Sequence, residues 1–154
     1  MNPVYKLTMD SPVGHLTLCG TDAALTGLSF GVEKSDVADA PAPFLERAAG
    51  ELTEYFAKKR RTFDLPLAPE GTKFQKKVWA ALCAIPFGET RTYGQIAAAL
   101  GNPKAARAVG MACNRNPIGI IVPCHRVVGA DGALTGYAGG LPVKAALLRL
   151  EAGE

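Results

Sequence analysis

Apolar and polar side chains alternate in three short runs within the first thirty residues, at 4–8, 15–19 and 25–30. Alternation with a period of two residues is typical of strands that have one buried face. Turn-forming residues separate the runs, at 11–14 (Ser-Pro-Val-Gly) and at 20–22 (Gly-Thr-Asp). The pattern predicts an antiparallel meander of three strands.

The period changes in residues 44–56, where apolar residues recur at steps of three and four, which predicts an amphipathic helix. The basic run 58–61 (Lys-Lys-Arg-Arg) suits a solvated helix end, because cations are stabilised at a helix C-terminus, although such a run could also contact nucleic acid. A Pro-rich stretch at 65–71 predicts an extended linker. We therefore expect two domains, 1–70 and 71–154.

Helical periodicity returns after the linker. Thr72 can cap the helix that follows it, and Thr92 can cap a second helix over 93–100. A Gly-Asn-Pro turn then leads into a third helix near 104–114. The order of helix, tight turn and helix predicts a helix-turn-helix.

A hairpin and a last helix complete the pattern. Residues 127–128 and 133–135 flank a Gly-Ala-Asp-Gly turn, which predicts a β-hairpin. Residues 141–151 predict the last helix. The expected fold class is α/β: a small N-terminal sheet-and-helix domain, followed by a mostly helical winged-helix domain.

Composition excludes several classes of protein. Of the 154 residues, 48% are hydrophobic and 20% are charged, which is enough for a packed core. No apolar run approaches the roughly 18 residues of a membrane span, and residues 1–10 lack the core of a signal peptide. We expect a soluble, cytoplasmic protein that does not bind membranes. With four cysteines, none in a CxxC pair, and two histidines, we expect free thiols and no metal site.

The charge is divided unevenly along the chain. Residues 1–70 carry seven Lys and Arg against ten Asp and Glu, whereas residues 71–154 carry ten against four. This asymmetry suggests that the second half meets a polyanion, although drift of surface charge would explain it equally well. The predicted third helix adds basic residues among many small ones, namely Lys104, Arg107 and Arg115. A slim basic helix suits a DNA groove, but an Ala-rich helix can also simply pack tightly on its neighbours.

The segment 123–126 (Pro-Cys-His-Arg) carries the strongest chemical signal. A thiolate is a strong nucleophile and a thiol a weak one, so a reactive cysteine needs a nearby base or positive charge. His125 and Arg126 can supply these to Cys124. Packing explains the remaining cysteines better, because they lie in strand or helix patterns: Cys19, Cys83 and Cys113.

Residues 123–128 (Pro-Cys-His-Arg-Val-Val) resemble the active-site signature of the O6-alkylguanine-DNA alkyltransferases. Further segments follow in the family's order, at 71–79, 85–94, 105–110, 116–117 and 136–141, and then at Glu151. The resemblance covers nearly all of 71–154. In 1–70 only the size, the strand pattern and the turn at 11–14 are similar to the family.

The resemblance implies a role for each matching residue. Cys124 would accept the alkyl group from O6 of guanine, His125 would deprotonate it through a water, and Glu151 would orient His125. Asn116 would brace the turn before the cysteine. Tyr93 would rotate a phosphate and protonate the leaving guanine.

The resemblance also implies how DNA is held. Arg107 would fill the gap left by a flipped nucleotide, and we place Lys104, Arg115 and Arg126 with it as DNA-binding residues. The guanine pocket would be lined by Val127, Tyr137, Ala138 and Gly139. The expected partner is double-stranded DNA that contains O6-alkylguanine, with O4-alkylthymine as a weaker substrate. The sequence has no cofactor-binding loop, so we expect no cofactor. We also expect a monomer, and a protein that is consumed after one transfer.

Three alternatives stay open at this point. A lesion-binding protein without activity can share the fold, but such proteins typically carry tryptophan at the acceptor position. A winged-helix transcription regulator has no use for a Cys-His pair with a distant Glu. A thiol hydrolase needs an oxyanion site, which we do not find in the sequence.

Overall fold

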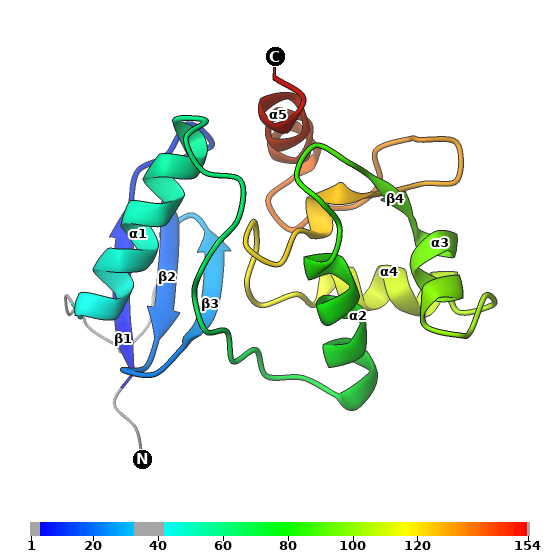
Figure 1. The fold of residues 1–154 in the computed structure, drawn as a ribbon, viewed down its shortest axis with the longest axis horizontal. Helices are drawn as coiled ribbons and strands as arrows, with labels where there is room; N and C mark the ends of the chain where they lie inside the picture. The colour runs from blue at the N-terminus through cyan, green and yellow to red at the C-terminus, as the bar shows by residue number, and fades with distance from the viewer. Residues whose placement is uncertain (1–3, 33–41, 154) are drawn as a thin grey trace. The chain divides into compact units, whose positions relative to one another are not determined.

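The computed structural model describes residues 4–32 and 42–153, which fall into two compact units, residues 1–70 and 71–154 (Figure 1). The N-terminal unit holds three strands and one helix: β1 (Tyr5–Met9), β2 (Leu16–Gly20), β3 (Leu25–Phe30) and α1 (Pro43–Phe56). The strands form an antiparallel sheet in the order β1-β2-β3, with Leu18 opposite both Leu7 and Leu28. The predicted meander is therefore confirmed.

Helix α1 packs on β1 and β2 and closes the core of this unit (Figure 1). Its apolar residues Leu45, Leu52 and Tyr55 are fully buried, as are Leu16 and Leu18 of β2. The helix therefore covers the sheet with the face that the three- and four-residue spacing predicts.

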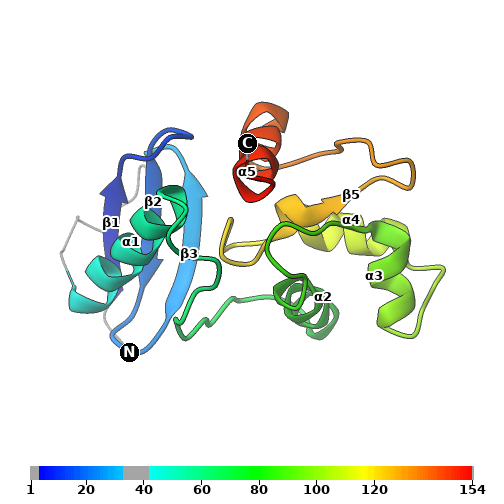
Figure 2. The same ribbon diagram turned by 45° about the horizontal axis from the view of Figure 1, so that its top comes forward.

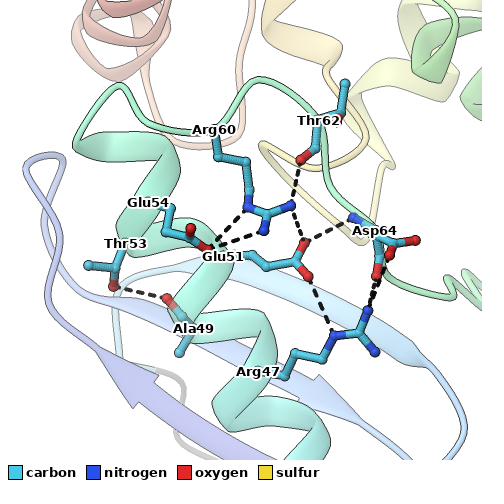
Figure 3. A network of polar contacts seen from close by, with 8 residues as sticks. All are labelled: Arg47, Ala49, Glu51, Thr53, Glu54, Arg60, Thr62 and Asp64. Atoms are coloured by element: carbon cyan, nitrogen blue, oxygen red, sulfur yellow. Dashed lines mark hydrogen bonds and ion pairs between the residues drawn. The ribbon is translucent and has the colours of Figure 1, made fainter.

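The basic run after α1 differs in part from the expected solvated helix end, because Arg60 folds back onto the helix (Figure 3). The buried carboxylate of Glu51 lies 3.4 Å from Arg60 and 3.5 Å from Arg47, and it accepts the backbone N–H of Asp64 at 2.9 Å. Arg60 also bonds to Glu54 at 3.2 Å. A buried charge is tolerated when it is paired in this way, so the network fixes the segment that follows α1.

The Pro-rich segment is extended, as predicted, but it is not free. The N–H of Leu25 donates to the carbonyl of Pro66 at 2.9 Å, and the N–H of Ala68 donates back to Leu25 at 2.8 Å. Leu67 thereby forms a parallel bridge with β3. The segment is thus part of the N-terminal unit as far as Ala68.

The C-terminal unit is mainly helical (Figure 2). Its elements are α2 (Lys73–Cys83), β4 (Arg91–Thr92), α3 (Tyr93–Ala99), α4 (Ala106–Asn114), the 3₁₀ turn η1 (Cys124–Arg126), β5 (Val127–Val128) and α5 (Leu141–Glu151). The predicted caps are confirmed: Thr72 and Thr92 each accept from the backbone of the third residue on, Gln75 and Gln95, whose side chains bond back. These capping boxes fix where α2 and α3 begin.

Helix α4 packs on both α2 and α3, as a helix-turn-helix requires (Figure 2). The buried indole of Trp79 in α2 donates its Nε1 hydrogen to the carbonyl of Ala112 in α4 at 2.9 Å. Helix α4 begins at Ala106, two residues later than Lys104, because the N–H of Ala105 closes a turn on the carbonyl of Asn102. Lys104 therefore lies in the turn and not on the helix.

The predicted hairpin is wrong. Strand β5 pairs in parallel with β4, with Arg91 opposite Val127, and residues 133–135 form no strand. A turn does close, from the N–H of Gly129 to the carbonyl of Ala133 at 2.9 Å. Beyond this turn the backbone carbonyls of Val127 and Thr135 accept hydrogen bonds from the side chain of Lys144, and not from each other's segment.

Candidate active site

Cys124 opens the η1 turn at the end of a buried segment and is only 7% exposed. The side chain of Asn116 secures this position. Its Nδ2 donates to the carbonyl of Val122 at 2.9 Å and contacts Sγ of Cys124 at 3.2 Å, while its Oδ1 accepts the N–H of Ile118 at 3.0 Å. One amide therefore joins the end of α4 to the turn and to the sulfur.

His125 follows with its imidazole fully buried, and its Nε2 lies 2.7 Å from Oε2 of Glu151. An ionised carboxylate can only accept hydrogen bonds, so Nε2 carries the proton. In the neutral ring the lone pair then lies on Nδ1, which is buried and has no hydrogen-bond partner among the described residues. The ring is therefore arranged to accept a proton at Nδ1.

Glu151 is the hub of this cluster. Besides His125, it accepts Nε and Nη2 of Arg126 at 2.7 and 3.0 Å and the N–H of Gly88 at 3.4 Å. Arg126 gives its remaining Nη1 to the carbonyl of Ile85 at 2.7 Å. Four donors on one buried carboxylate hold it in a single orientation.

The structure corrects the expectation that Arg126 binds DNA. Its guanidinium is buried and makes three hydrogen bonds to Glu151 and to the carbonyl of Ile85, so it is held inside the unit and not on the surface that a phosphate could reach. The sequence cannot show this, because the residue pattern around Arg126 does not depend on whether its side chain faces solvent or the core.

Burial dominates the electrostatics of the site. It raises the pKa of the Cys124 thiol, while the Asn116 hydrogen bond and the charge of Lys144 work in the opposite direction. Burial lowers the pKa of His125, although Glu151 partly offsets this. At neutral pH the site therefore holds a thiol beside a neutral imidazole, and activation of the sulfur needs a base.

Tyr93 and Arg107 lie together on a groove of about 720 Å³. Tyr93 is the first residue of α3, and its hydroxyl hydrogen-bonds to that of Thr135 at 2.7 Å. The groove is lined by residues of α3, α4 and the segment after β5, among them Arg107, Met111 and Thr135. It is thus formed by the helix-turn-helix together with that segment.

The two other predicted DNA-binding residues of this region are exposed: Lys104 in the turn before α4, and Arg115 at its C-terminal cap. Neither lines the groove. Arg107, which is also exposed, is thus the one member of the predicted basic set that does so. The structure brings Arg107 and Tyr93 together from separate helices.

The four residues expected around guanine do not line that groove. Val127 is buried in β5, and Ala138 is exposed in the segment before α5. Tyr137 packs edge-on against the His125 ring, with ring centroids 6.5 Å apart, and burial raises its pKa. Gly139, which lies next to Ala138, is half-buried. Of the four, Tyr137 is thus the one whose side chain contacts the imidazole.

Sequence reasoning missed two residues. Lys144 of α5 is fully buried and bonds to the carbonyls of Val127 and Thr135. Thr135 also binds Tyr93 through its hydroxyl. The sequence offers one signal for Lys144: it lies three residues before the apolar Leu147 and so shares a helix face with it. The structure shows that both residues are buried.

Within residues 4–32 and 42–153, no group of three His, Cys, Asp or Glu side chains is placed to hold a metal ion. None of the helices in this part of the chain is long and apolar enough to cross a membrane.

Comparison with known protein families gives two matches that together span almost the whole chain. Residues 73–153 match the DNA binding domain of 6-O-methylguanine DNA methyltransferase, and residues 4–69 match its ribonuclease-like domain. The methylated-DNA–protein-cysteine methyltransferase of Methanosarcina acetivorans is 54% identical over 153 residues, which cover 96% of this chain and 98% of that protein.

Solved structures agree with these matches. The crystal structure of Mycobacterium tuberculosis O6-methylguanine methyltransferase is 49% identical, with a TM-score of 0.90 over 98% of this chain and 94% of that one. Mycobacterium tuberculosis OGT in complex with DNA is 51% identical, with a TM-score of 0.90 over 97% and 93%. Likeness of this extent covers both units of the chain.

Proposed function

Because the chain belongs to the 6-O-methylguanine DNA methyltransferase family, we propose that it repairs O6-alkylguanine in double-stranded DNA by transferring the alkyl group to its own Cys124. One observation carries the assignment of the acceptor. Sγ of Cys124 contacts the amide of Asn116 at 3.2 Å, beside a buried imidazole that is hydrogen-bonded to Glu151 at 2.7 Å. The other cysteines lack this setting.

The transfer is a displacement at a saturated carbon. The proton of the Cys124 thiol passes, through a water, to Nδ1 of His125, and the sulfur attacks the alkyl carbon. The carbon–sulfur bond forms as the bond from carbon to O6 breaks, and the electron pair of that bond stays on guanine. Guanine takes up one proton, for which we propose Tyr93 as the donor. Atoms and charges balance without a cofactor.

The product explains why one molecule reacts once. A thioether on Cys124 is not hydrolysed by water under mild conditions, and we identify no second nucleophile beside Cys124 among the described residues of the site. Imidazole and carboxylate serve only to activate the sulfur. We therefore propose that the protein is consumed stoichiometrically. We also propose that O4-alkylthymine is a second, weaker substrate.

The DNA must present the lesion outside the base stack, because O6 of guanine is out of reach inside it. We propose that Arg107 fills the gap left by the flipped nucleotide. It is exposed on α4 and lines the same groove as Tyr93. The net positive charge of residues 71–154 supports binding to phosphates without sequence preference.

The location that fits this activity and these thiols is the cytoplasm. Cys19, Cys83, Cys113 and Cys124 are all free in the structure. Free thiols persist in a reducing compartment. A tagged copy of the protein, followed by cell fractionation, tests this part of the proposal.

The proposed reaction is tested by incubating the protein with a duplex that contains one O6-methylguanine. Intact-mass measurement should show a gain of one methyl group per molecule, and peptide mapping should place it on Cys124. Cys124→Ser should abolish transfer while retaining DNA binding, and Cys113→Ser, the matched control on a buried thiol, should react normally. Repeated turnover, or methylation at another cysteine, would overturn the assignment.

A further inference from the structure

Lys144 is a lysine with no exposed surface, in the middle of α5. Lysine is among the residues least often fully buried, because removing its charge from water is costly unless the charge is hydrogen-bonded. Its Nζ donates to the carbonyl of Val127 at 2.6 Å and to that of Thr135 at 2.8 Å. Two of the three donors of the ammonium group are thus engaged with backbone.

The two acceptors belong to the segments that frame the reactive cysteine. Val127 follows the η1 turn directly, and Thr135 lies in the segment that lines the groove. Thr135 then continues the chain of contacts, because its hydroxyl bonds to Tyr93 at 2.7 Å. Lys144 therefore joins α5 to β5, and through Thr135 to α3.

The ammonium also acts on the thiols. Within the described part of the chain, ionisable groups from three elements interact electrostatically with Cys124: Tyr93 from α3, Cys113 from α4, Lys144 from α5, and also Tyr137 from the segment before α5. Among them Lys144 is the cation. Its charge opposes the effect of burial on the pKa of Cys124, and it also interacts with Cys113.

We infer that Lys144 is a positioning residue for the transfer: its ammonium holds the segment of Thr135 on β5 and compensates the negative charge that develops on the sulfur of Cys124. The inference rests on the proposed function only in taking Cys124 as the acceptor. His125 removes the proton, the sulfur becomes anionic, and the charge of Lys144 favours that state. After alkylation the sulfur is neutral, and this compensation is lost.

The neighbouring groups allow a clean measurement of pH dependence. Burial and Cys124 raise the pKa of Cys113 to about 12. Burial also raises the pKa of Tyr93 and of Tyr137, and it lowers that of His125. At neutral pH these shifts keep Cys113, Tyr93 and Tyr137 protonated and His125 neutral, while burial lowers the pKa of Lys144, so the titration of that lysine must be measured as well. Peptide mapping assigns the reactivity midpoint to Cys124, and the titration of Lys144 is measured separately.

The test uses iodoacetamide, which alkylates a thiolate without DNA, and follows the modification of Cys124 by peptide mapping as a function of pH. Lys144→Met should move the midpoint up by about one unit, which is about a tenfold slower reaction below the midpoint. Lys144→Arg, which keeps the charge, should restore most of the shift. Lys76→Met, which removes the charge of an exposed lysine on α2, is the matched control and should leave the midpoint in place. A folded Lys144→Met protein with an unchanged midpoint would overturn the inference.

A second measurement needs no substitution, in case Lys144→Met does not fold. The titration of Lys144 can be followed by NMR of ¹³C-labelled lysine before and after iodoacetamide treatment. Cys124 raises the pKa of Lys144, so removing its negative charge should lower the Lys144 midpoint. An unchanged midpoint would contradict the inference. Both measurements stand without DNA, so a failure of repair activity would not be confused with a failure of this inference.

Discussion

The imidazole of His125 is held by the carboxylate of Glu151, with Nε2 and Oε2 2.7 Å apart in a fully buried contact. Because the same carboxylate also binds Arg126, one side chain fixes both the direction of the proposed base and the place of a buried cation. Orientation of the base and stability of the unit are therefore coupled. A substitution of Glu151 is therefore expected to lower both the rate of transfer and the free energy of unfolding.

Glu151→Gln should slow methyl transfer on the order of 10²-fold, because an amide no longer stabilises the imidazolium that forms on His125. It should also lower the free energy of unfolding by about 3 kcal/mol, since the buried Arg126 loses its counter-ion. Single-turnover kinetics and urea unfolding measure the two effects. Glu89→Gln, which changes an exposed carboxylate paired with Arg91, is the control and should be near wild type in both. Normal transfer by Glu151→Gln would exclude the orienting role.

Asn116→Ala should destabilise the protein by about 1–3 kcal/mol, because the carbonyl of Val122 and the N–H of Ile118 lose their partner. The variant should also raise the pKa of Cys124, since a hydrogen bond that favours the thiolate is removed. Thermal melting and the pH dependence of iodoacetamide alkylation check the two parts. Asn102→Ala, in the exposed turn between α3 and α4, serves as the matched change. A normal melting temperature of Asn116→Ala would show that the hydrogen bonds of the Asn116 side chain do not stabilise the protein.

Arg107→Ala should reduce repair of a duplex far more than transfer from a free O6-alkylguanine base, because only the duplex has a gap to fill. It should also reduce the slope of log Kd against log salt by about one if the guanidinium meets a phosphate. Gel-shift titrations and single-turnover rates provide the readouts. Arg149→Ala removes an equal charge from an exposed site on α5 and should spare the duplex preference. Equal losses on both substrates would contradict the wedge role.

The pH dependence of stability follows from His125. Burial lowers its folded-state pKa below the unfolded value of about 6.5, so the unfolded chain binds more protons in mild acid. Stability should therefore be complete above about pH 6.5 and fall as the pH drops towards the folded pKa. Urea unfolding at pH 7.5, 6.5 and 5.5 measures the slope. In His125→Gln the part of the slope that comes from this histidine should disappear, and an identical slope would show that His125 is not buried in its neutral form.

Methylated protein should melt earlier than unreacted protein. Cys124 is 7% exposed and its sulfur contacts the Asn116 amide, so a methyl group adds volume to a packed site. Overpacking of this kind costs about 1–3 kcal/mol. Calorimetry before and after stoichiometric reaction gives the comparison. Equal melting temperatures would mean that the pocket absorbs the group without strain.

Local patterns predicted most of the elements, because their causes lie within a few residues. The meander follows from alternation, and α2 and α3 begin at Thr72 and Thr92, which have glutamines at the third position to complete their caps. The hairpin was not predictable in the same way. A turn sequence at 129–132 does not show that the backbone carbonyls of Val127 and Thr135 are taken by the side chain of Lys144.

Neighbouring residue types singled out Cys124 and His125 as candidates, and the structure places both in one buried cluster, while their roles stay predictions. The sequence gives no such signal where only the direction of a side chain decides. Arg126 turns inward because Glu151 supplies a buried counter-charge from 25 residues away. Lys144 is buried because two carbonyls from separate segments meet its ammonium. Neither the counter-charge of Arg126 nor the acceptors of Lys144 can be identified without the folded chain.

Trp79 gives the molecule a built-in optical reporter. It is the one tryptophan in the sequence, and its buried indole bonds to the carbonyl of Ala112, the residue before Cys113 in α4. Tryptophan emission depends on the polarity and hydrogen bonding of the indole. Excited at a wavelength that the four tyrosines do not absorb, the fluorescence of the protein therefore reports on the contact between α2 and α4. If α4 moves when Arg107 engages DNA, or when alkylation of Cys124 disturbs Asn116, this signal should change. Binding and alkylation can therefore be followed in real time, and told apart by their rates, in unlabelled protein.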